Sequence, residues 1–372
     1  MSGNERIALM LPKLSTYGGA EGFSFRLATA LAAAGYPVDF ICARQETVEP
    51  KGVNVVSVGR PPLGRAAKIA WFAYAAERAR RRGGYALTLS MGKTVCQDIL
   101  RMSGGPLSEF WRLSKRAYAP GFEREFKMLR RRLAPANSLI RLLEHRALEN
   151  QELCIAVSHR VQDWLLTAHP WLAEREMKVI YNRPDLSRFS PAREDERTRI
   201  RSNMGLGQAD RLIVLAGTNF ALKGLGTLIR ALVFLPREVR VHVAGNRNPG
   251  HFKALAQSLA VQDRLAFLGR VDDMPSLYQA SDLFCLPSFY DTCSNAVLEA
   301  LASGTRVISS RDNGSSHFLP PECVVDDPGD ARALARAIEQ SLNAPRPQGF
   351  DWPEDVESGL EPYLDIVRRR LG

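Results

Sequence analysis

The amino-acid sequence predicts an α/β protein made of two doubly wound domains, each with a parallel sheet covered by helices on both faces. Three observations carry this prediction. Short apolar runs alternate with longer amphipathic segments, which is the pattern of βαβ units. The alternation starts twice, near residues 7 and 212, and a proline-containing stretch at 178–191 separates the two series. At 372 residues, the chain is long enough for two domains of ordinary size.

The composition indicates a globular protein with free thiols and an anionic partner. Hydrophobic residues make up 45% of the sequence and charged residues 24%, which is typical of globular domains. The six cysteines include no Cys-x-x-Cys pair, so we expect a reducing compartment and neither disulfides nor a zinc site. The formal net charge of +10 predicts binding to nucleic acid, a membrane surface or a phosphorylated substrate.

Signals for membrane spanning or secretion are absent from the sequence. An apolar run of about 18 or more residues, which a spanning helix needs, does not occur. Residues 1–6 lead directly into an apolar strand, without the charged and apolar regions of a signal peptide. We therefore expect a cytoplasmic protein.

The first domain is expected to begin with a strand at 7–11, which Gly18 and Gly19 follow. A Gly-Gly turn after a first strand lets the backbone approach a ligand closely, although such a pair also occurs as a plain turn. An amphipathic helix is predicted to start near residue 22 and to run to about residue 34. Further strands are expected at 38–42, 53–58, 85–90 and 153–158, and further helices at 66–82 and 161–166.

The segment 101–146 interrupts this alternation with many basic residues interleaved with aromatic residues and leucines. Such a segment can lie on an anionic membrane surface, at about 1 kcal/mol per Lys or Arg. It can equally be a solvated basic face with a buried apolar stripe, and both interpretations stay open. No nucleic-acid-binding motif accompanies the basic residues, so we expect no nucleic-acid partner.

The second domain shows the alternation more cleanly, and the tail at 353–371 is also predicted to be helical. Strands are expected at 212–216, 239–244, 265–268, 283–286, 307–309 and 324–325, and helices at 224–234, 252–260, 274–279, 294–303 and 331–342.

The stretch 282–308 organises the second domain and reads as strand, loop, helix, glycine stop and next strand. Asp291 lies in the loop and Glu299 about two turns into the helix, so both can face a ligand at the helix N-terminus. The free backbone N–H groups of that terminus form a seat for phosphate. The alternative is an ordinary strand–helix unit with incidental acids.

Lys223 lies between the strand at 212–216 and the helix that begins at Gly224. A cation at the carboxyl end of a parallel strand, beside a helix N-terminus, suits the binding of a diphosphate. A surface lysine without function is the alternative.

The stretch 282–308 resembles the signature of the retaining glycosyltransferases of family 4, which have the GT-B fold. Asp291 stands where that signature has its first Glu, and Arg306 replaces its usual Pro. The linker at 182–191 also resembles the hinge of that family. The positions that match in place are Ser288, Asp291, Glu299, Ala300, Ala302, Gly304 and Val307 in the signature and Asn182, Asp185, Phe189 and Pro191 in the hinge.

The resemblance implies two Rossmann-like domains that face each other across a cleft. Residues 1–183 would bind the acceptor, with Gly18 and Gly19 lining that side of the cleft. Residues 184–352 would bind the nucleotide sugar. The C-terminal helix 353–372 would cross back to the first domain.

The resemblance also implies the roles of the site residues. Lys223 would meet the diphosphate, with Asn219 as a further hydrogen-bond donor, while Thr218 replaces an Arg that the family usually carries. Glu299 would bind the ribose, and Asp291 the sugar hydroxyls or the developing oxocarbenium ion. Backbone amides would hold the phosphates, so no metal is expected. These amides belong to the residues around Thr292, Cys293, Ser294 and Asn295.

In the first domain, the segment 90–105 is similar to the lipopolysaccharide-core glucosyltransferases of this family. Gly104 stands where those proteins carry an Asp, so the first-domain catalytic acid is not identified by the resemblance. Asp98 and Lys93 are the remaining candidates.

The implied function is retaining transfer of a hexose from a nucleotide diphosphate sugar, UDP-linked, to a lipopolysaccharide-core or similar glycan acceptor at the cytoplasmic face of the inner membrane. The segment 101–146 would bind that membrane peripherally. Two alternatives stay open. One is a nucleotide-sugar epimerase, although the His and acidic residues of such sites are missing. The other is a catalytically silent protein that binds a membrane or a partner, which the departures at Thr218 and Gly104 favour.

Overall fold

A computed structural model of the chain describes residues 5–347 and 349–372 and divides them into two compact units. The first unit comprises the chain up to Trp111, Pro120–Tyr181 and Val356–Gly372, and the second comprises Arg112–Ala119 and Asn182–Asp355. The predicted domains were 1–183 with 353–372, and 184–352. The structure moves these limits by a few residues and assigns 112–119 to the second unit. Residues 1–4 of the predicted first domain lie outside the described residues.

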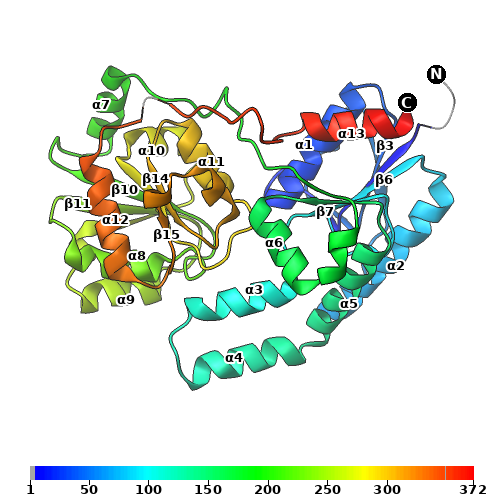
Figure 1. Ribbon diagram of the computed structural model, residues 1–372, viewed down its shortest axis with the longest axis horizontal. Coiled ribbons are helices and arrows are strands. Elements are labelled where there is room, and N and C mark those ends of the chain that lie inside the picture. The colour runs from blue at the N-terminus through cyan, green and yellow to red at the C-terminus, as the bar shows by residue number, and fades with distance from the viewer. Residues whose placement is uncertain (1–4, 348) are drawn as a thin grey trace. The chain divides into compact units, whose positions relative to one another are not determined.

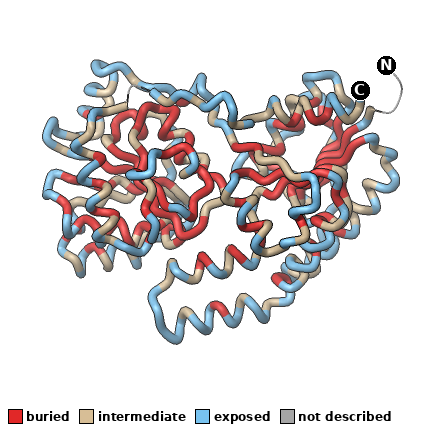
Figure 2. Tube along the Cα trace, in the orientation of Figure 1, coloured by how far each residue is buried: buried red, intermediate tan, exposed pale blue. Residues whose placement is uncertain are grey.

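The first unit is built on a seven-stranded sheet in the order β5-β3-β1-β6-β7-β8-β9, and all neighbouring strands in it are parallel. Its central strands are buried, as their near-continuous apolar sequences predict for strands covered on both faces (Figure 2). The strands are β1 (Ile7–Met10), β3 (Val38–Cys42), β5 (Val53–Ser57), β6 (Leu87–Ser90), β7 (Ile99–Met102), β8 (Leu153–Ala156) and β9 (Met177–Val179); β2 (Lys13–Leu14) and β4 (Arg44–Gln45) form a separate pair.

The helices of the first unit include three between β7 and β8, in the segment expected to be basic and amphipathic. The first helix starts at Gly19 and not near residue 22, so Gly19 belongs to the helix and Gly18 is its N-cap. The helices are α1 (Gly19–Ala33), α2 (Arg65–Gly83), α4 (Phe122–Leu133), α5 (Pro135–Glu149), α6 (His159–Ala168) and α13 (Glu361–Leu371), while α3 (Leu107–Ser114) runs from the first unit into residues of the second.

The C-terminal helix α13 completes the core of the first unit, which confirms the predicted crossing of the tail. Tyr363, Ile366 and Val367 are buried in one cluster with apolar residues of β1 and α1. Helices α1 and α13 lie side by side (Figure 1), and the rings of Phe23 and Tyr363 meet edge to face at 5.1 Å. The hydroxyl of Tyr363 accepts a hydrogen bond of 2.8 Å from Nε of the buried Arg101.

The second unit has a six-stranded parallel sheet in the order β12-β11-β10-β13-β14-β15. The strands are β10 (Arg211–Ala216), β11 (Val239–Ala244), β12 (Leu265–Gly269), β13 (Leu283–Leu286), β14 (Val307–Ser310) and β15 (Val324–Val325). The helices are α7 (Glu194–Asn203), α8 (Leu225–Ala231), α9 (Gly250–Ser258), α10 (Met274–Ala280), α11 (Asn295–Ala302) and α12 (Ala331–Asn343). From β10 the chain adds β11 and β12 on one side and then β13, β14 and β15 on the other. The candidate site lies at this switch between β10 and β13.

Among the described residues, no helix is both long and apolar enough to cross a membrane. The same residues include no group of three or more His, Cys, Asp or Glu side chains arranged to hold a metal ion.

Candidate donor site in the second unit

The candidate site lies at the carboxyl ends of β10 and β13. These two strands are neighbours in the sheet, with Ile213 paired to Leu283, but the chain visits β11 and β12 on the other side of β10 between them. Open α/β sheets bind ligands at such a reversal of strand order, because the loops that leave it separate and open a crevice. Lys223 follows β10 and Asp291 follows β13, so both predicted residues belong to this edge.

Lys223 and Asp291 form an ion pair across the two loops, between Nζ and Oδ2. Their side chains retain only 20% and 11% of their exposure. Gly224 allows this approach, since its φ is 74° and a Cβ there would lie 2.1 Å from the carbonyl oxygen of Pro287. The sequence placed the two residues at the same ligand, and the structure brings them into direct contact.

The backbone of Asp291 is fixed by the neighbouring loop after β14. Its N–H donates to the carbonyl of Asp312 at 3.0 Å, and its carbonyl accepts from the N–H of Gly314 at 2.9 Å. The carboxylate of Asp312 is in turn paired with Arg116 at 2.9 Å. These hydrogen bonds hold the backbone of Asp291 in place, so a ligand can displace Lys223 from the carboxylate without moving that backbone.

The N-terminus of α11 provides the donors expected for phosphate. The first N–H groups of an α-helix have no intrahelical partner, and the side chain of the N-cap Ser294 makes no capping hydrogen bond to those of α11. The side chain of Asn295 accepts a hydrogen bond of 2.8 Å from Asn182. Cys293 and Ser294 are buried, and Thr292 is half-buried. These four positions remain predictions as phosphate contacts.

Glu299 lies on α11 and accepts a hydrogen bond of 3.2 Å from the hydroxyl of Tyr278. Burial, together with the neighbouring carboxylate of Glu299, raises the pKa of Tyr278 well above its ordinary value, so this hydroxyl stays a donor. The contact fixes one end of the carboxylate. The predicted role of Glu299 in binding ribose stays a prediction.

The loop after β10 also contains Asn219 and Thr218, which are both exposed. The side chain of Asn219 accepts a hydrogen bond of 3.3 Å from the N–H of Leu222 and so shapes the turn before Lys223. The carbonyl of Thr218 accepts a hydrogen bond of 3.0 Å from Nε of Arg247. Sequence reasoning missed Arg247, although its place just after β11 was a usable signal, because loops at the carboxyl ends of adjacent parallel strands meet.

In the first unit, the loop after β6 carries Lys93 in a left-handed conformation, with φ of 65°. Such a conformation costs about 1–3 kcal/mol for a non-glycine residue and is concentrated at functional sites. The hydroxyl of Ser90 accepts from the N–H of Gly92 at 3.0 Å and holds the loop in place. Desolvation by the surrounding loop lowers the pKa of Lys93 although the residue reaches the surface; Arg65 lowers the pKa further, and Glu21 opposes the change.

Asp98 has structural partners at the opposite edge of the same sheet. It directly precedes β7, and its carboxylate accepts hydrogen bonds from the N–H and the hydroxyl of Thr88, at 2.6 and 2.8 Å. This position is the amino end of the strands, whereas ligands of parallel sheets bind at the carboxyl ends. The catalytic role predicted for Asp98 stays untested, and these contacts do not favour it.

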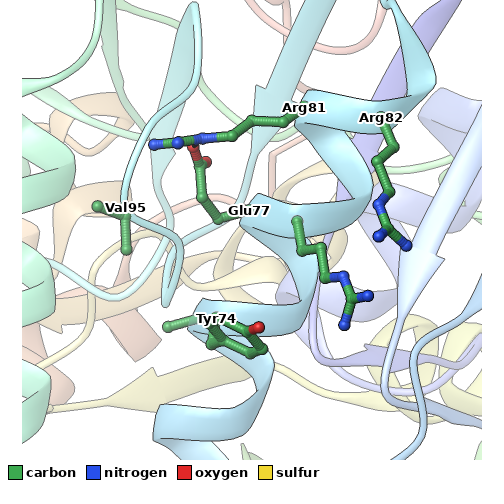
Figure 3. A pocket seen from close by; sticks show the side chains of 7 residues that line it. Tyr74, Glu77, Arg81, Arg82 and Val95 are labelled. Atoms are coloured by element: carbon green, nitrogen blue, oxygen red, sulfur yellow. Dashed lines mark hydrogen bonds and ion pairs between the residues drawn. The ribbon is translucent and has the colours of Figure 1, made fainter.

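An open hollow of about 660 Å³ lies on α2 in the first unit, and its lining includes none of the residues predicted for the donor site (Figure 3). Glu77 points to Arg81 within it. Burial raises the pKa of Glu77, but hydrogen bonds from Arg80 and Arg81 outweigh this effect and lower it overall. Val95 lines the other side.

The part of the chain that matches a known family lies within the second unit. Residues 210–344, which lie within the second unit, match the family model described as Glycosyl transferases group 1. The D-inositol 3-phosphate glycosyltransferase of Salinispora arenicola is 31% identical over 223 residues, which are 51% of this chain and 50% of the relative. The lipopolysaccharide glucosyltransferase WaaG of Escherichia coli is 26% identical over 45% of this chain and 47% of the relative. The chain thus spans about half the length of these curated relatives.

Solved structures extend the similarity over the whole chain at the level of the fold. The crystal structure of WaaG, a glycosyltransferase involved in lipopolysaccharide biosynthesis, superposes with a TM-score of 0.73 at 19% identity, over 98% of this chain and 94% of that one. HepE from Anabaena, solved in complex with UDP-glucose, gives a TM-score of 0.66 at 18% identity, over 91% and 90% of the two chains.

The two parallel-sheet units thus define the GT-B class of glycosyltransferase folds, as the sequence predicted. Within that class, residues 210–344 match the family model described as Glycosyl transferases group 1, and the remainder of the chain is related to glycosyltransferases at the level of the fold. The resemblance to glycosyltransferases that the signature at 282–308 carries is confirmed.

Proposed function

We propose that this protein is a retaining glycosyltransferase that moves a hexose from a nucleotide diphosphate sugar, UDP-linked, to a glycan or glycolipid acceptor. The observation that carries the proposal is the meeting of Lys223, Asp291 and the N-terminus of α11 at the reversal of strand order in the second unit. A cation and helix N–H groups at one edge are complementary to a diphosphate. The names of the relatives, and the UDP-glucose bound by HepE, support this donor class.

The proposed mechanism starts with an exchange of partners at Lys223. The donor diphosphate binds at the N-terminus of α11 and draws Lys223 away from Asp291, because two phosphate groups carry more charge than one carboxylate. Asp291 is then free to accept hydrogen bonds from the sugar hydroxyls or to stabilise the developing oxocarbenium ion. Glu299 accepts hydrogen bonds from the ribose.

The bond between the anomeric carbon and the diphosphate oxygen then breaks, and negative charge grows on the departing diphosphate. An acceptor hydroxyl forms the new glycosidic bond on the same face of the sugar and passes its proton to the departing diphosphate. The helix N–H groups and Lys223 already face that charge, so they stabilise the transition state without reorganisation. The scheme assigns no step to a metal ion. Gly18 and Gly19, at the carboxyl end of β1, are proposed to lie near the acceptor.

We also propose that α4 binds the protein to the cytoplasmic face of an anionic membrane, where the protein meets its acceptor. Its large apolar side chains recur at helical spacing and yet face solvent, with Phe122 82% and Leu133 71% exposed. Phe126 and Leu129 complete this exposed apolar stripe, and Lys127, Arg130 and Arg132 are exposed on the same helix. An unpaired apolar stripe beside cations is the pattern of an interfacial helix. A lipopolysaccharide-core acceptor would be presented at such a surface.

A thermal-shift panel of UDP, GDP, ADP and their common sugar conjugates tests the donor proposal. A ligand that binds only the folded chain adds about 2.7 kcal/mol of stability at a hundredfold excess over its dissociation constant. We expect a shift with the UDP series. A panel without any shift, together with no donor hydrolysis or transfer above background, would contradict the proposal and favour a silent binding protein.

A further inference from the structure

We propose that Arg247 is the second cation of the diphosphate site and replaces from a neighbouring loop the charge that Thr218 does not supply. The inference rests on the proposed function and specifies which groups of this chain recognise the nucleoside diphosphate.

Lys223 and Arg247 lie against the same two residues of backbone. A Cβ on Gly217 would lie 2.9 Å from Cγ of Lys223 and 3.2 Å from its Cε, so the lysine stem crosses directly over Gly217. Nε of Arg247 donates to the carbonyl of Thr218 at 3.0 Å. The side chain of Lys223 therefore lies against residue 217, and that of Arg247 against residue 218.

Gly245 explains why a residue that follows β11 can reach the loop after β10. Its φ is 154°, and a Cβ there would lie 2.1 Å from the carbonyl oxygen of Gly217. Its N–H donates to the carbonyl of Gly269 at 2.7 Å, while the N–H of Gly217 donates to the carbonyl of Ala244 at 3.0 Å. The loops are held in backbone contact, and a side chain at 245 would force them apart.

The charge balance at Lys223 calls for a further cation. Lys223 is neutralised by Asp291 in the structure, so its charge becomes available to a diphosphate only as that pair opens. Arg247 is exposed and has no ion pair with any other described residue. Its charge is thus available from the first encounter with an anion.

The geometry of Arg247 also suits a diphosphate. Since Nε is used by Thr218, the plane of the guanidinium is fixed, and its two terminal nitrogens remain to donate. Arginine donors in one plane match the oxygens of phosphate groups, and a pre-oriented guanidinium loses little freedom on binding. Arg247 would thereby take part in recognising the leaving group rather than the nucleoside.

The test compares Arg247→Ala with Arg230→Ala by titration calorimetry with UDP and with UMP. Arg230 is a matched control, because it is exposed in the same unit and donates to a backbone carbonyl, that of Gly226, at 3.0 Å. We expect Arg247→Ala to weaken UDP binding about tenfold and UMP binding much less, so that the preference for the diphosphate falls. Arg230→Ala should leave both affinities unchanged.

A rescue variant separates recognition from a structural effect. In Thr218→Arg combined with Arg247→Ala, the cation returns from the loop after β10, and UDP affinity should recover to within about threefold of the parent value. Unchanged UDP affinity in Arg247→Ala, or an equal loss for UDP and UMP, would overturn the inference while leaving the donor proposal standing. If the parent protein bound none of UDP, GDP and ADP, the donor proposal itself would fail, and the inference with it.

Discussion

The ion pair between Lys223 and Asp291 places two opposite demands on the same lysine. The diphosphate needs its charge, and the carboxylate holds that charge in the ligand-free protein. Because both side chains are largely buried, neither can turn to bulk water without loss, and each therefore depends on the other until a ligand arrives. Donor binding is thus a competition between two anions for one cation.

Variants of the two partners should change UDP affinity in opposite directions. Lys223→Ala removes a charge-assisted contact and should weaken UDP binding about tenfold or more. Asp291→Asn removes the competitor and should tighten UDP binding by up to about fivefold, while sugar transfer falls. Calorimetry and a transfer assay measure both effects. Asp326→Asn breaks an exposed pair with Arg311 and serves as the control; weaker UDP binding in Asp291→Asn would contradict the competition.

His242 gives a pH dependence that is independent of the site. Burial lowers its pKa from the ordinary 6.5, and Arg240 lowers it further, while Nδ1 is buried without a partner among the described residues. The unfolded chain takes up this proton at a higher pH than the folded chain. The stability that His242 contributes is therefore complete above pH 6.5 and is lost as the pH falls through the lower, folded pKa.

We expect His242→Gln to flatten the fall in the free energy of unfolding between pH 6.5 and 5, by at most about 1.4 kcal/mol per pH unit. Denaturant unfolding at a series of pH values measures this slope, in a window above the titration of ordinary carboxylates. His251→Gln, at an exposed position on α9, is the control. Parallel slopes in parent and His242→Gln would show that His242 does not titrate on unfolding.

At the scale of elements, α4 carries an apolar stripe of which four side chains, Phe122, Phe126, Leu129 and Leu133, are exposed. Met128 is its buried residue, and α5 packs against that side of the helix. Phe122 and Phe126 stack at 5.9 Å on the exposed side. An exposed apolar stripe of this kind is typical of an interaction site, and the basic residues around it favour an anionic lipid surface.

Replacing Phe122 and Phe126 with Ser should reduce sedimentation with vesicles that contain anionic lipid, because inserted apolar area and charge attraction act together. Neutralising Arg130, Arg131 and Arg132 should reduce it as well, by about 1 kcal/mol per charge, and this loss should shrink at high salt. Val48→Ser removes an equally exposed apolar side chain elsewhere in the first unit and is the control. Vesicle binding that none of these changes alters would leave α4 as a solvated face.

Most helices and strands of the second unit could be predicted from the sequence, and some elements of the first unit could not. Strands and helices with unbroken apolar patterns, such as β13 and α11, were predicted to within a residue or two, and so was the location of Lys223 and Asp291. β7 was missed because it carries Arg101 in a buried strand. Its guanidinium donates hydrogen bonds to the hydroxyl of Ser103 and to that of Tyr363, which lies far along the chain. Arg247 was missed although its place just after β11 was a usable signal, because its contact with Thr218 has no local pattern in the sequence.

At the scale of the whole molecule, the first unit depends on residues from three separate parts of the chain. α13 supplies Tyr363, which is fully buried against α1 and accepts the hydrogen bond of Arg101. Arg101 also lies over the ring of Phe23, at 3.8 Å from its centroid. The side chain of Tyr363 thus has two roles: its ring packs against α1, and its hydroxyl accepts a hydrogen bond from Arg101 of β7.

We expect Tyr363→Ala to lower the free energy of unfolding by about 3–5 kcal/mol, since it removes a large buried side chain. Tyr363→Phe keeps the packing and removes only the acceptor of Arg101, so its cost should be about 1–2 kcal/mol. Denaturant titration measures both values, and Tyr74→Ala at an exposed position on α2 is the control. Equal losses in the two Tyr363 variants would show that the hydroxyl, and not the ring, carries the effect.

The position of α13 also constrains how the polypeptide can fold as it leaves the ribosome. The second unit is continuous from Asn182 to Asp355 apart from the short segment Arg112–Ala119, which is made earlier. The first unit begins to appear earlier still, but α13 follows only after all of residues 182–355, an interval on the order of ten seconds at a synthesis rate of about 5–20 residues per second. The face of α1 that later receives Tyr363 must stay uncovered during that time. The second unit can therefore reach its native state before the first, which reverses the usual order of N-terminal folding and makes the nascent first unit a natural client of chaperones.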